Sequence, residues 1–265
     1  MSILEAIILG IVQGLTEFIP VSSSGHLVLV HKLFGQNIAG DLAFDVALHF
    51  GTLLSLLVYF RSEVWRLAGG LLGRNDSTKL AWLVALATVP AVVVGFLLAD
   101  TIEEHTRSVF FVAGSFLCIG LYMLYAEKRQ QHQQRPKKLL SLNAKQAVII
   151  GLAQAVALLP GVSRSGATIT TGLYFGFSRV AATKFSFLMA IPIITGAVIK
   201  VFVSEGVSGL GGDITTVVIG IGTAFVSGLL AITFLLRYLA KNTLRPFAYY
   251  LVGMSFNAVL IGLAT

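Results

Sequence analysis

The sequence predicts an all-α membrane protein that crosses the bilayer several times and is built as an inverted-topology repeat. Composition is the first observation: 56% of the 265 residues are hydrophobic, 12% are charged, and the mean hydropathy is +0.86, which is typical of polytopic membrane proteins. The second is a set of apolar runs long enough to span a bilayer. The third is a pair of similar segments, 6–26 and 147–167, that interrupt two further runs.

Six apolar runs are long enough to cross the roughly 30 Å hydrocarbon layer as single helices. They cover residues 43–60, 80–99, 108–126, 183–203, 214–236 and 246–264. Each half of the chain therefore supplies three spanning helices.

Two shorter runs, 3–19 and 146–159, stop at proline and at clusters of serine and glycine, and a second short apolar run follows each. A span broken in this way would leave backbone polar groups unsatisfied in lipid. We therefore expect two re-entrant helical hairpins buried in protein, over residues 3–34 and 146–177.

The chain then divides into repeat one (1–130), a basic cytoplasmic linker (131–145) and repeat two (146–265). Each repeat has one hairpin, which does not cross, and three helices that do. Three crossings are an odd number, so the second repeat must lie inverted relative to the first.

The basic residues provide a test of this topology, because cytoplasmic loops carry an excess of Lys and Arg. If the loop 61–79 is cytoplasmic, most of the 19 basic residues fall on that side. The exceptions are Lys32, Arg107, Lys200 and Arg164. The sequence thus predicts a multi-pass protein with its C-terminus outside. The net charge of +7 is explained by these loops and indicates no nucleic-acid partner.

The two similar segments differ mainly in charge. Glu17 and His26 occur only in the first, whereas Arg164 occurs only in the second, opposite Ser23. Ionisable residues at membrane depth cost roughly 2.5–3.5 kcal/mol on insertion scales and usually have a function. One interpretation is an ion pair of Arg164 with Glu17 or His26 that only holds the hairpins together. The surrounding hydroxyls and glycines favour the other, a composite anion site between the repeats.

The start of each returning helix suits a phosphate or pyrophosphate group. Arg164 offers a planar, permanently charged fork for bidentate contacts, and backbone N–H groups at helix starts favour anions. Ser22 and Ser163 are candidate N-caps of these helices. The candidate substrate-binding residues in the two segments are Ser22, Ser24, Ser163, Arg164 and Ser165.

Two pairs of polar residues share a helix face in the first hairpin. Ser23 and His26 are three apart, and a hydroxyl beside an imidazole serves as a nucleophile with its base, or as a phosphate ligand with a proton donor. Gln13 and Glu17 are four apart. Glu17 either holds a divalent cation against phosphate oxygens or orients His26. His49 lies in an apolar run, and we expect it to be a packed core residue outside the site.

Two motifs, QGLTEFIPVSSSGH at 13–26 and PGVSRSGAT at 160–168, resemble those of the undecaprenyl-diphosphate phosphatase family of the bacitracin-resistance type. The resemblance covers essentially the whole chain. It implies an enzyme of the bacterial plasma membrane that removes the terminal phosphate of a polyprenyl diphosphate lipid, undecaprenyl diphosphate. This reaction recycles the carrier lipid for cell-wall synthesis, and the family requires a divalent cation, Mg²⁺ or Ca²⁺.

The resemblance also implies which residues function. They are Gln13, Glu17, Ser22, Ser23, His26, Ser163, Arg164 and Thr168. Because the first motif position is Gln13 rather than Glu, Glu17 remains the one carboxylate for the metal. We expect Ser23, His26, Glu17 and Arg164 to be catalytic. Ser23 is the candidate nucleophile with His26 as its proton acceptor, and a water activated by His26 is the alternative.

A secondary transporter or flippase for an anionic or phosphorylated lipid is the competing function, because inverted repeats with re-entrant hairpins are typical of transporters. The pair of Ser23 and His26 favours catalysis, since transport needs no nucleophile with a base. A PAP2-type lipid phosphatase is excluded, because its basic opening motif is missing. Helix glycines such as Gly69 and Gly70 fit close packing within one chain or in a homodimer.

Overall fold

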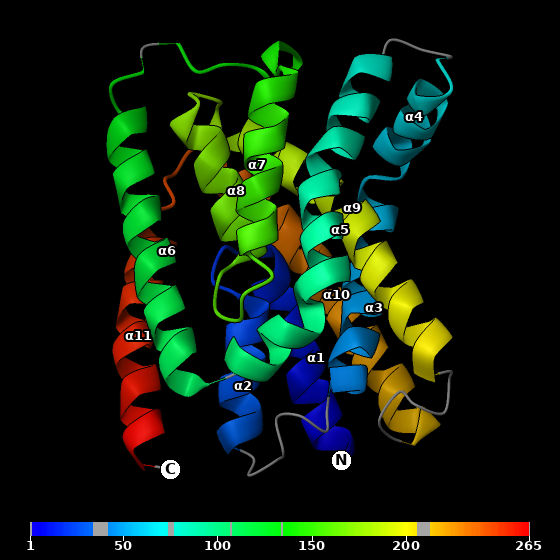
Figure 1. The fold of residues 1–265 in the computed structure, drawn as a ribbon, viewed down its shortest axis with the longest axis vertical. Coiled ribbons are helices and arrows are strands. Elements are labelled where there is room, and N and C mark those ends of the chain that lie inside the picture. The colour runs from blue at the N-terminus through cyan, green and yellow to red at the C-terminus, as the bar shows by residue number, and fades with distance from the viewer. Residues whose placement is uncertain are drawn as a thin grey trace.

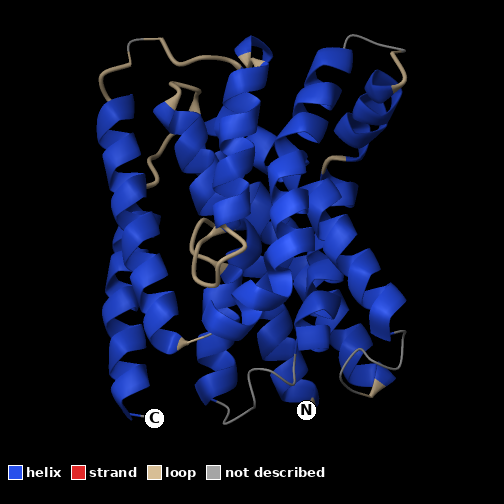
Figure 2. Ribbon diagram, viewed as in Figure 1, coloured by secondary structure: helices blue, strands red, loops and turns tan. Residues whose placement is uncertain are grey.

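The fold is all-helical, as the composition predicts. The computed structural model describes residues 2–33, 42–73, 77–106, 108–133, 135–205 and 213–264. Within these ranges the regular structure is helical, apart from one isolated bridge between Lys137 and Phe177. The helices stand side by side in one bundle, and both chain ends lie at the same end of it (Figures 1 and 2).

The first half of the chain forms α1 (Ile3–Phe18), α2 (Ser23–Leu33), α3 (Leu42–Tyr59), α4 (Arg61–Leu71), α5 (Thr78–Thr106) and α6 (Val109–Gln130). The second half forms the 3-10 helix η1 (Leu139–Ser141), α7 (Ala144–Val156), α8 (Arg164–Tyr174), α9 (Arg179–Glu205), α10 (Ile214–Leu239) and α11 (Arg245–Ala264). Among the described residues, α5, α6, α9, α10 and α11 are long and apolar enough to cross a membrane, and α3 with α4 makes a sixth candidate. These helices coincide with the six predicted spans.

The helix α4 differs from the expectation of a plain loop over 61–79. The chain bends by 84° between α3 and α4, with Phe60 buried at the bend. The segment is too polar to be recognised as a span, and its helix forms beside α5. Arg74 in the same loop, and Arg107 in the loop before α6, lie outside the described residues.

The two broken helices form hairpins that come from opposite ends of the bundle, and their turns meet near its middle (Figure 1). The first helix ends at Phe18, two residues before Pro20, because the residue before a proline disfavours the helical conformation. The first helix of the second hairpin, α7, ends at Val156. Gly161, in the turn of that hairpin, has φ +85°, a backbone conformation that glycine adopts readily. Residue 34, the last of the first predicted hairpin, lies outside the described ranges.

Each hairpin packs against a spanning helix from the other half of the chain: α1 against α10, and α7 against α5. Small residues allow this close approach. A Cβ on Gly10 would lie 2.6 Å from the Gly220 carbonyl oxygen, and one on Gly151 would lie 2.2 Å from that of Ala87. Gly10 and Gly151 occupy the same position of the two similar segments. Each half of the chain therefore holds the other half's hairpin in place.

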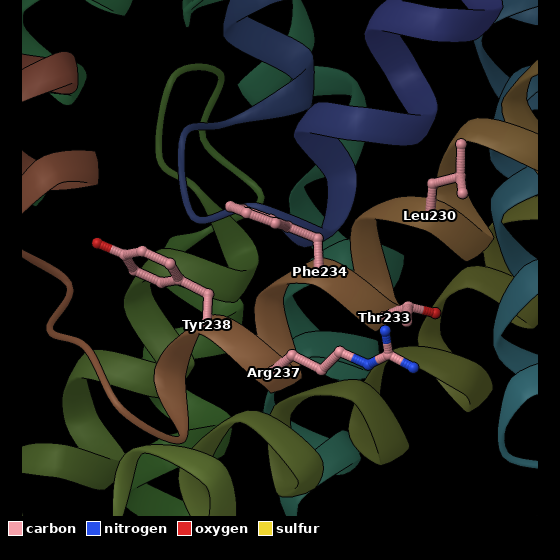
Figure 3. Close-up of a pocket in the computed structure, with 5 residues that line it drawn as sticks. All are labelled: Leu230, Thr233, Phe234, Arg237 and Tyr238. Atoms are coloured by element: carbon pink, nitrogen blue, oxygen red, sulfur yellow. The ribbon is translucent and has the colours of Figure 1, made fainter.

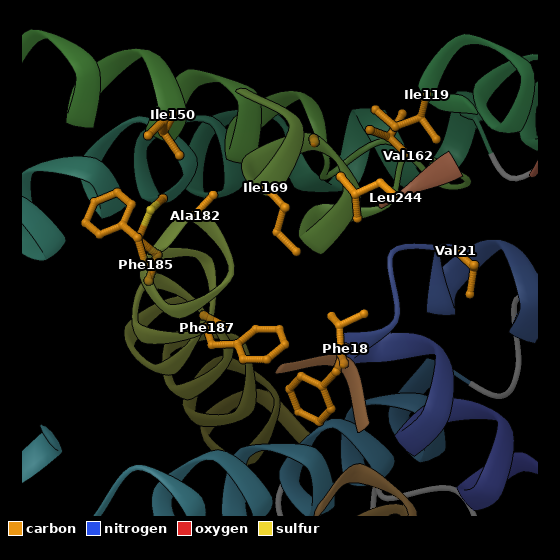
Figure 4. Close-up of a cluster of buried hydrophobic side chains, with 14 of the residues drawn as sticks. Phe18, Val21, Ile119, Ile150, Val162, Ile169, Ala182, Phe185, Phe187 and Leu244 are labelled. Atoms are coloured by element: carbon orange, nitrogen blue, oxygen red, sulfur yellow. The ribbon is translucent and has the colours of Figure 1, made fainter. Parts of the chain in front are cut away.

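The largest buried apolar cluster surrounds the two turns (Figure 4). The rings of Phe18 and Phe187 meet edge to face, with centroids 5.3 Å apart. Val21 and Val162, one from each turn, are buried in the same cluster. The turns that interrupt the two helices are thus enclosed by protein, which is the condition for irregular backbone at membrane depth.

A buried ion pair joins three parts of the chain at the end where α6 finishes and α9 begins. Glu127 is fully buried and accepts hydrogen bonds from Arg179 Nε at 2.8 Å and Nη2 at 2.5 Å. The backbone N–H of Leu244 donates to the same carboxylate at 2.7 Å. Glu127 therefore connects α6, α9 and the turn before α11.

Replacing Glu127 with glutamine should destabilise the fold by about 2–3 kcal/mol, because the partly buried Arg179 guanidinium loses its counter-charge and a charge-assisted hydrogen bond is lost. Unfolding in mixed micelles titrated with SDS would measure the free energy of unfolding. Lys128→Gln, at the exposed next position, is the control and should change little. Equal midpoints for the two variants would contradict the assignment.

Candidate active site

The turns of the two hairpins are in direct contact, and each satisfies polar groups of the other. The Gly161 backbone N–H donates to Ser24 Oγ at 3.4 Å, and Ser165 Oγ donates to the Ile19 carbonyl at 3.4 Å. Two predicted substrate-binding serines therefore lie at the junction between the hairpins.

Glu17 and Arg164 meet at this junction, one from the end of α1 and one from the start of α8. Arg164 Nη2 donates to Glu17 Oε1 at 2.6 Å, and the two side chains are only 12% and 6% exposed. The ion pair between Arg164 and Glu17, which is one interpretation of the sequence, is therefore formed. It does not stand alone, because further polar groups converge on both partners.

Three side chains approach the other oxygen of Glu17. Ser23 Oγ donates to Oε2 at 2.6 Å, and Gln13 Nε2 donates to it at 3.1 Å. His49 Nε2 lies 3.5 Å from the same oxygen. The assignment of His49 to the core is therefore corrected, because α3 places its ring beside Glu17. A lone histidine in an apolar run gave no signal of this.

The other side of Arg164 faces α9. Its Nη1 donates to the Ser186 carbonyl at 3.4 Å, and the Ser186 hydroxyl lies 2.6 Å from that of Thr168. Thr168 also donates to the Arg164 carbonyl at 2.8 Å. Thr168, which the sequence predicts to be a site residue, therefore lies beside Arg164. Ser186 also belongs to the site, although nothing in its apolar run distinguishes it in the sequence.

The two expected helix caps differ in geometry. Ser163 is the N-cap of α8, and its hydroxyl accepts from the Gly166 N–H at 3.0 Å. Ser22 has φ +72°, a left-handed conformation that costs a non-glycine residue about 1–2 kcal/mol. Its hydroxyl is 3.4 Å from the Gly25 N–H. Backbone strain of this kind tends to occur at functional sites.

His26 is held by groups other than Ser23. Its Nδ1 lies 2.7 Å from the Ser22 carbonyl, so Nδ1 carries a proton, because a carbonyl only accepts. Its Nε2 lies 2.7 Å from the Tyr250 hydroxyl, and the two rings are stacked at an interplanar angle of 8°. The predicted contact between Ser23 and His26 is therefore wrong, and Ser23 is hydrogen-bonded to Glu17 instead. Ser22 and Tyr250, rather than Glu17, orient His26.

The residues around Glu17 fit a divalent cation only if the substrate supplies further ligands. In the described part of the chain, no group of three or more His, Cys, Asp or Glu side chains could hold a metal. The Gln13 amide reaches Glu17 through Nε2, and its Oε1 is buried and has no hydrogen-bond partner. Mg²⁺ is usually bound by one or two carboxylates together with substrate phosphates. One carboxylate and one unpaired amide oxygen match that pattern.

Known proteins resemble this chain over nearly its whole length. The family model described as "Bacitracin resistance protein BacA" matches residues 6–257. An "Undecaprenyl-diphosphatase" from Alteromonas mediterranea is 41% identical, with 98% of each chain covered. One from Rubrobacter xylanophilus is 45% identical over 94% of each chain. The match includes both hairpins and the residues that meet between them, and the chain therefore belongs to the bacitracin resistance protein BacA family.

Proposed function

We propose that this chain is an integral membrane phosphatase that hydrolyses undecaprenyl diphosphate to undecaprenyl phosphate and phosphate. Its substrate is a polyprenyl diphosphate lipid, and the reaction returns the carrier lipid to cell-wall synthesis. The names of relatives at 41–45% identity support the reaction and the substrate. The observation that carries the proposal is the meeting of Arg164 with Glu17 and Ser23 at a junction buried in the membrane-spanning bundle.

The site supplies what phosphoryl transfer needs, which is positioning and charge stabilisation more than covalent chemistry. Arg164 lies at the N-terminal end of α8, where the helix dipole and the first N–H groups favour an anion. Ser24 and Ser165 lie at the junction, and the hydroxyls of Ser22 and Ser163 are within hydrogen-bond distance of theirs. A bound diphosphate would compete with Glu17 for the Arg164 guanidinium.

Ser23 is the proposed nucleophile, with Glu17 rather than His26 as the group that accepts its proton. The Ser23 Oγ–phosphorus bond forms as the bond between the terminal phosphorus and the bridging oxygen breaks, and undecaprenyl phosphate leaves. Water then hydrolyses the phosphoserine to phosphate and free Ser23. The proposal rests on the 2.6 Å hydrogen bond from Ser23 to Glu17. Attack by a water activated by His26 is the alternative.

We also propose that the reaction uses a divalent cation, Mg²⁺ or Ca²⁺, held by Glu17 and Gln13 Oε1. Such an ion neutralises phosphate charge. The unpaired Gln13 oxygen supports this assignment.

The proposed orientation places the C-terminus outside. Both chain ends lie at one end of the bundle, and the linker between α6 and α7 lies at the other (Figure 1). The basic residues Lys137, Lys138 and Lys145 in or beside the linker favour a cytoplasmic location for that end. The first hairpin would then enter from outside.

Phosphate release from undecaprenyl diphosphate by the purified protein in detergent tests the proposal. Release should require a divalent cation and stop on chelation, and undecaprenyl phosphate should yield none. Detergent removes any gradient, so transport does not register. Substrate binding by folded protein without release would instead favour a lipid transporter, which the opposed hairpins also resemble.

If a water activated by His26 is the nucleophile, Tyr250→Phe should lower kcat about tenfold with little change in KM, because it removes the hydroxyl that contacts His26 Nε2 and retains the stacked ring. The contacts that orient a metal-bound histidine are worth about 10- to 100-fold in the same way. The ¹⁵N resonance of His26 Nε2 should shift in the same variant. Tyr249→Phe, at a position 62% exposed, is the control. Normal kcat with an unmoved His26 signal would remove Tyr250 from the site.

A further inference from the structure

Among the described residues, two surface cavities of the bundle lie away from the Glu17–Arg164 junction. One is a hollow along a single helix, α10, lined by Leu230, Thr233, Phe234, Arg237 and Tyr238 (Figure 3). The other has a volume of 360 Å³, opens to the surface and is lined mainly by residues of α4, α5, η1 and α9. This second volume falls within the range of ligand pockets, about 300–1,000 Å³. We call it the α4–α9 cavity.

The polar lining of the α4–α9 cavity is mainly basic. Lys79 comes from α5 and Lys184 from α9, whereas Arg66 and the acidic Glu63 both come from α4. Lys79 Nζ also donates to the Leu140 carbonyl at 3.4 Å, which ties it to η1. Lys79 and Lys184 bring two positive charges from separate helices to one cavity, and these charges favour an anion.

The rest of the lining is apolar and suits a hydrocarbon chain. Leu80 and Leu139 are partly exposed and Leu140 is 82% exposed, whereas Leu83 and Leu188 form the buried floor beneath them. A water-soluble anion would gain nothing from such a wall. An amphiphile with an anionic head and an acyl chain would contact both parts.

The position of the cavity matches a membrane surface. The bend of 84° turns α4 away from the spanning α3. Two tryptophans near the cavity are largely exposed: Trp65 on α4 at 79% and Trp82 on α5 at 58%. Exposed tryptophans at helix ends are typical of the membrane–water interface. The cavity lies at the end of the bundle that carries the basic linker. Basic pockets between helices on the cytoplasmic side bind lipid headgroups of negative charge.

We propose that the α4–α9 cavity binds an anionic phospholipid such as phosphatidylglycerol. Lys79 and Lys184 contact its phosphate, and an acyl chain lies along Leu80, Leu139 and Leu140. This site is separate from the junction of the hairpins and does not depend on the reaction performed there.

Native mass spectrometry of the delipidated full chain would measure the affinities for phosphatidylglycerol, phosphatidylcholine and glycerol 3-phosphate. We expect the protein to prefer phosphatidylglycerol. Lys79→Gln combined with Lys184→Gln should weaken its binding about tenfold, since each basic residue near an anionic surface contributes to the attraction. The matched control is Lys145→Gln combined with Lys241→Gln, two exposed lysines outside the cavity lining, which should change the affinity less than twofold.

Three results would overturn the proposal. Equal affinity for phosphatidylglycerol and phosphatidylcholine would remove the requirement for an anion. Equal loss in both double variants would reduce the effect to net charge. Binding of glycerol 3-phosphate as tight as that of the lipid would show a phosphate site without a role for the leucines. Thermal unfolding at the wild-type temperature would establish that both double variants are folded.

Discussion

Arg164→Ala is expected to lower kcat/KM for phosphate release by about 10³-fold or more, the scale on which phosphoryl-transfer enzymes depend on such an arginine. Arg164 is 12% exposed, so its charge acts on the substrate with little screening by water. Arg164→Lys retains the charge and loses the planar fork, and should recover only part of the activity. Arg237→Ala, on exposed α10 surface, is the control.

The same substitution also removes the counter-charge of buried Glu17, which typically destabilises a protein by about 3–5 kcal/mol. A second variant separates this effect from catalysis. Arg164→Ala combined with Glu17→Gln leaves no unpaired charge at the junction, so it should regain thermal stability without regaining activity. A folded Arg164→Ala protein that keeps a tenth of normal kcat/KM would contradict the proposed role.

Ser23→Ala is expected to lower kcat by about 10²–10⁴-fold, the range lost with a positioned proton-transfer partner, and by more if the covalent route is followed. The Ser23 hydroxyl is the group that the structure places on the Glu17 carboxylate. Thr16→Val is the matched control, because the Thr16 hydroxyl donates to the Val12 carbonyl of its own helix and should leave kcat nearly unchanged.

Acid quenching during turnover followed by mass spectrometry should detect phosphate on Ser23 in the wild-type chain. Near-normal turnover by Ser23→Ala would remove the covalent route. It would leave attack by a water activated by His26, in which case His26→Ala should show the larger loss.

The sequence alone predicts the helical fold, the six spans and the two broken helices. Each depends on local properties: hydropathy over about 20 residues sets a span, and Pro20 and Gly161 interrupt helices by their own backbone geometry. Charged groups are costly in lipid, so Glu17, His26 and Arg164 are likewise predicted to be functional before their contacts are known. The bend after α3 is not predicted from local properties, because the polar α4 has no hydropathy signal.

Only the tertiary structure decides which of these residues meet. Ser23 and His26 are neighbours on one helix, yet Ser23 pairs with Glu17, and His26 pairs with Tyr250, 224 positions away in the chain. His49 and Ser186 join the site for the same reason. Local sequence determines where a helix breaks and which charges lie at depth. The rotation of each helix, and hence the direction of each side chain, is set by packing between the two halves of the chain, as at Gly10 and Gly151.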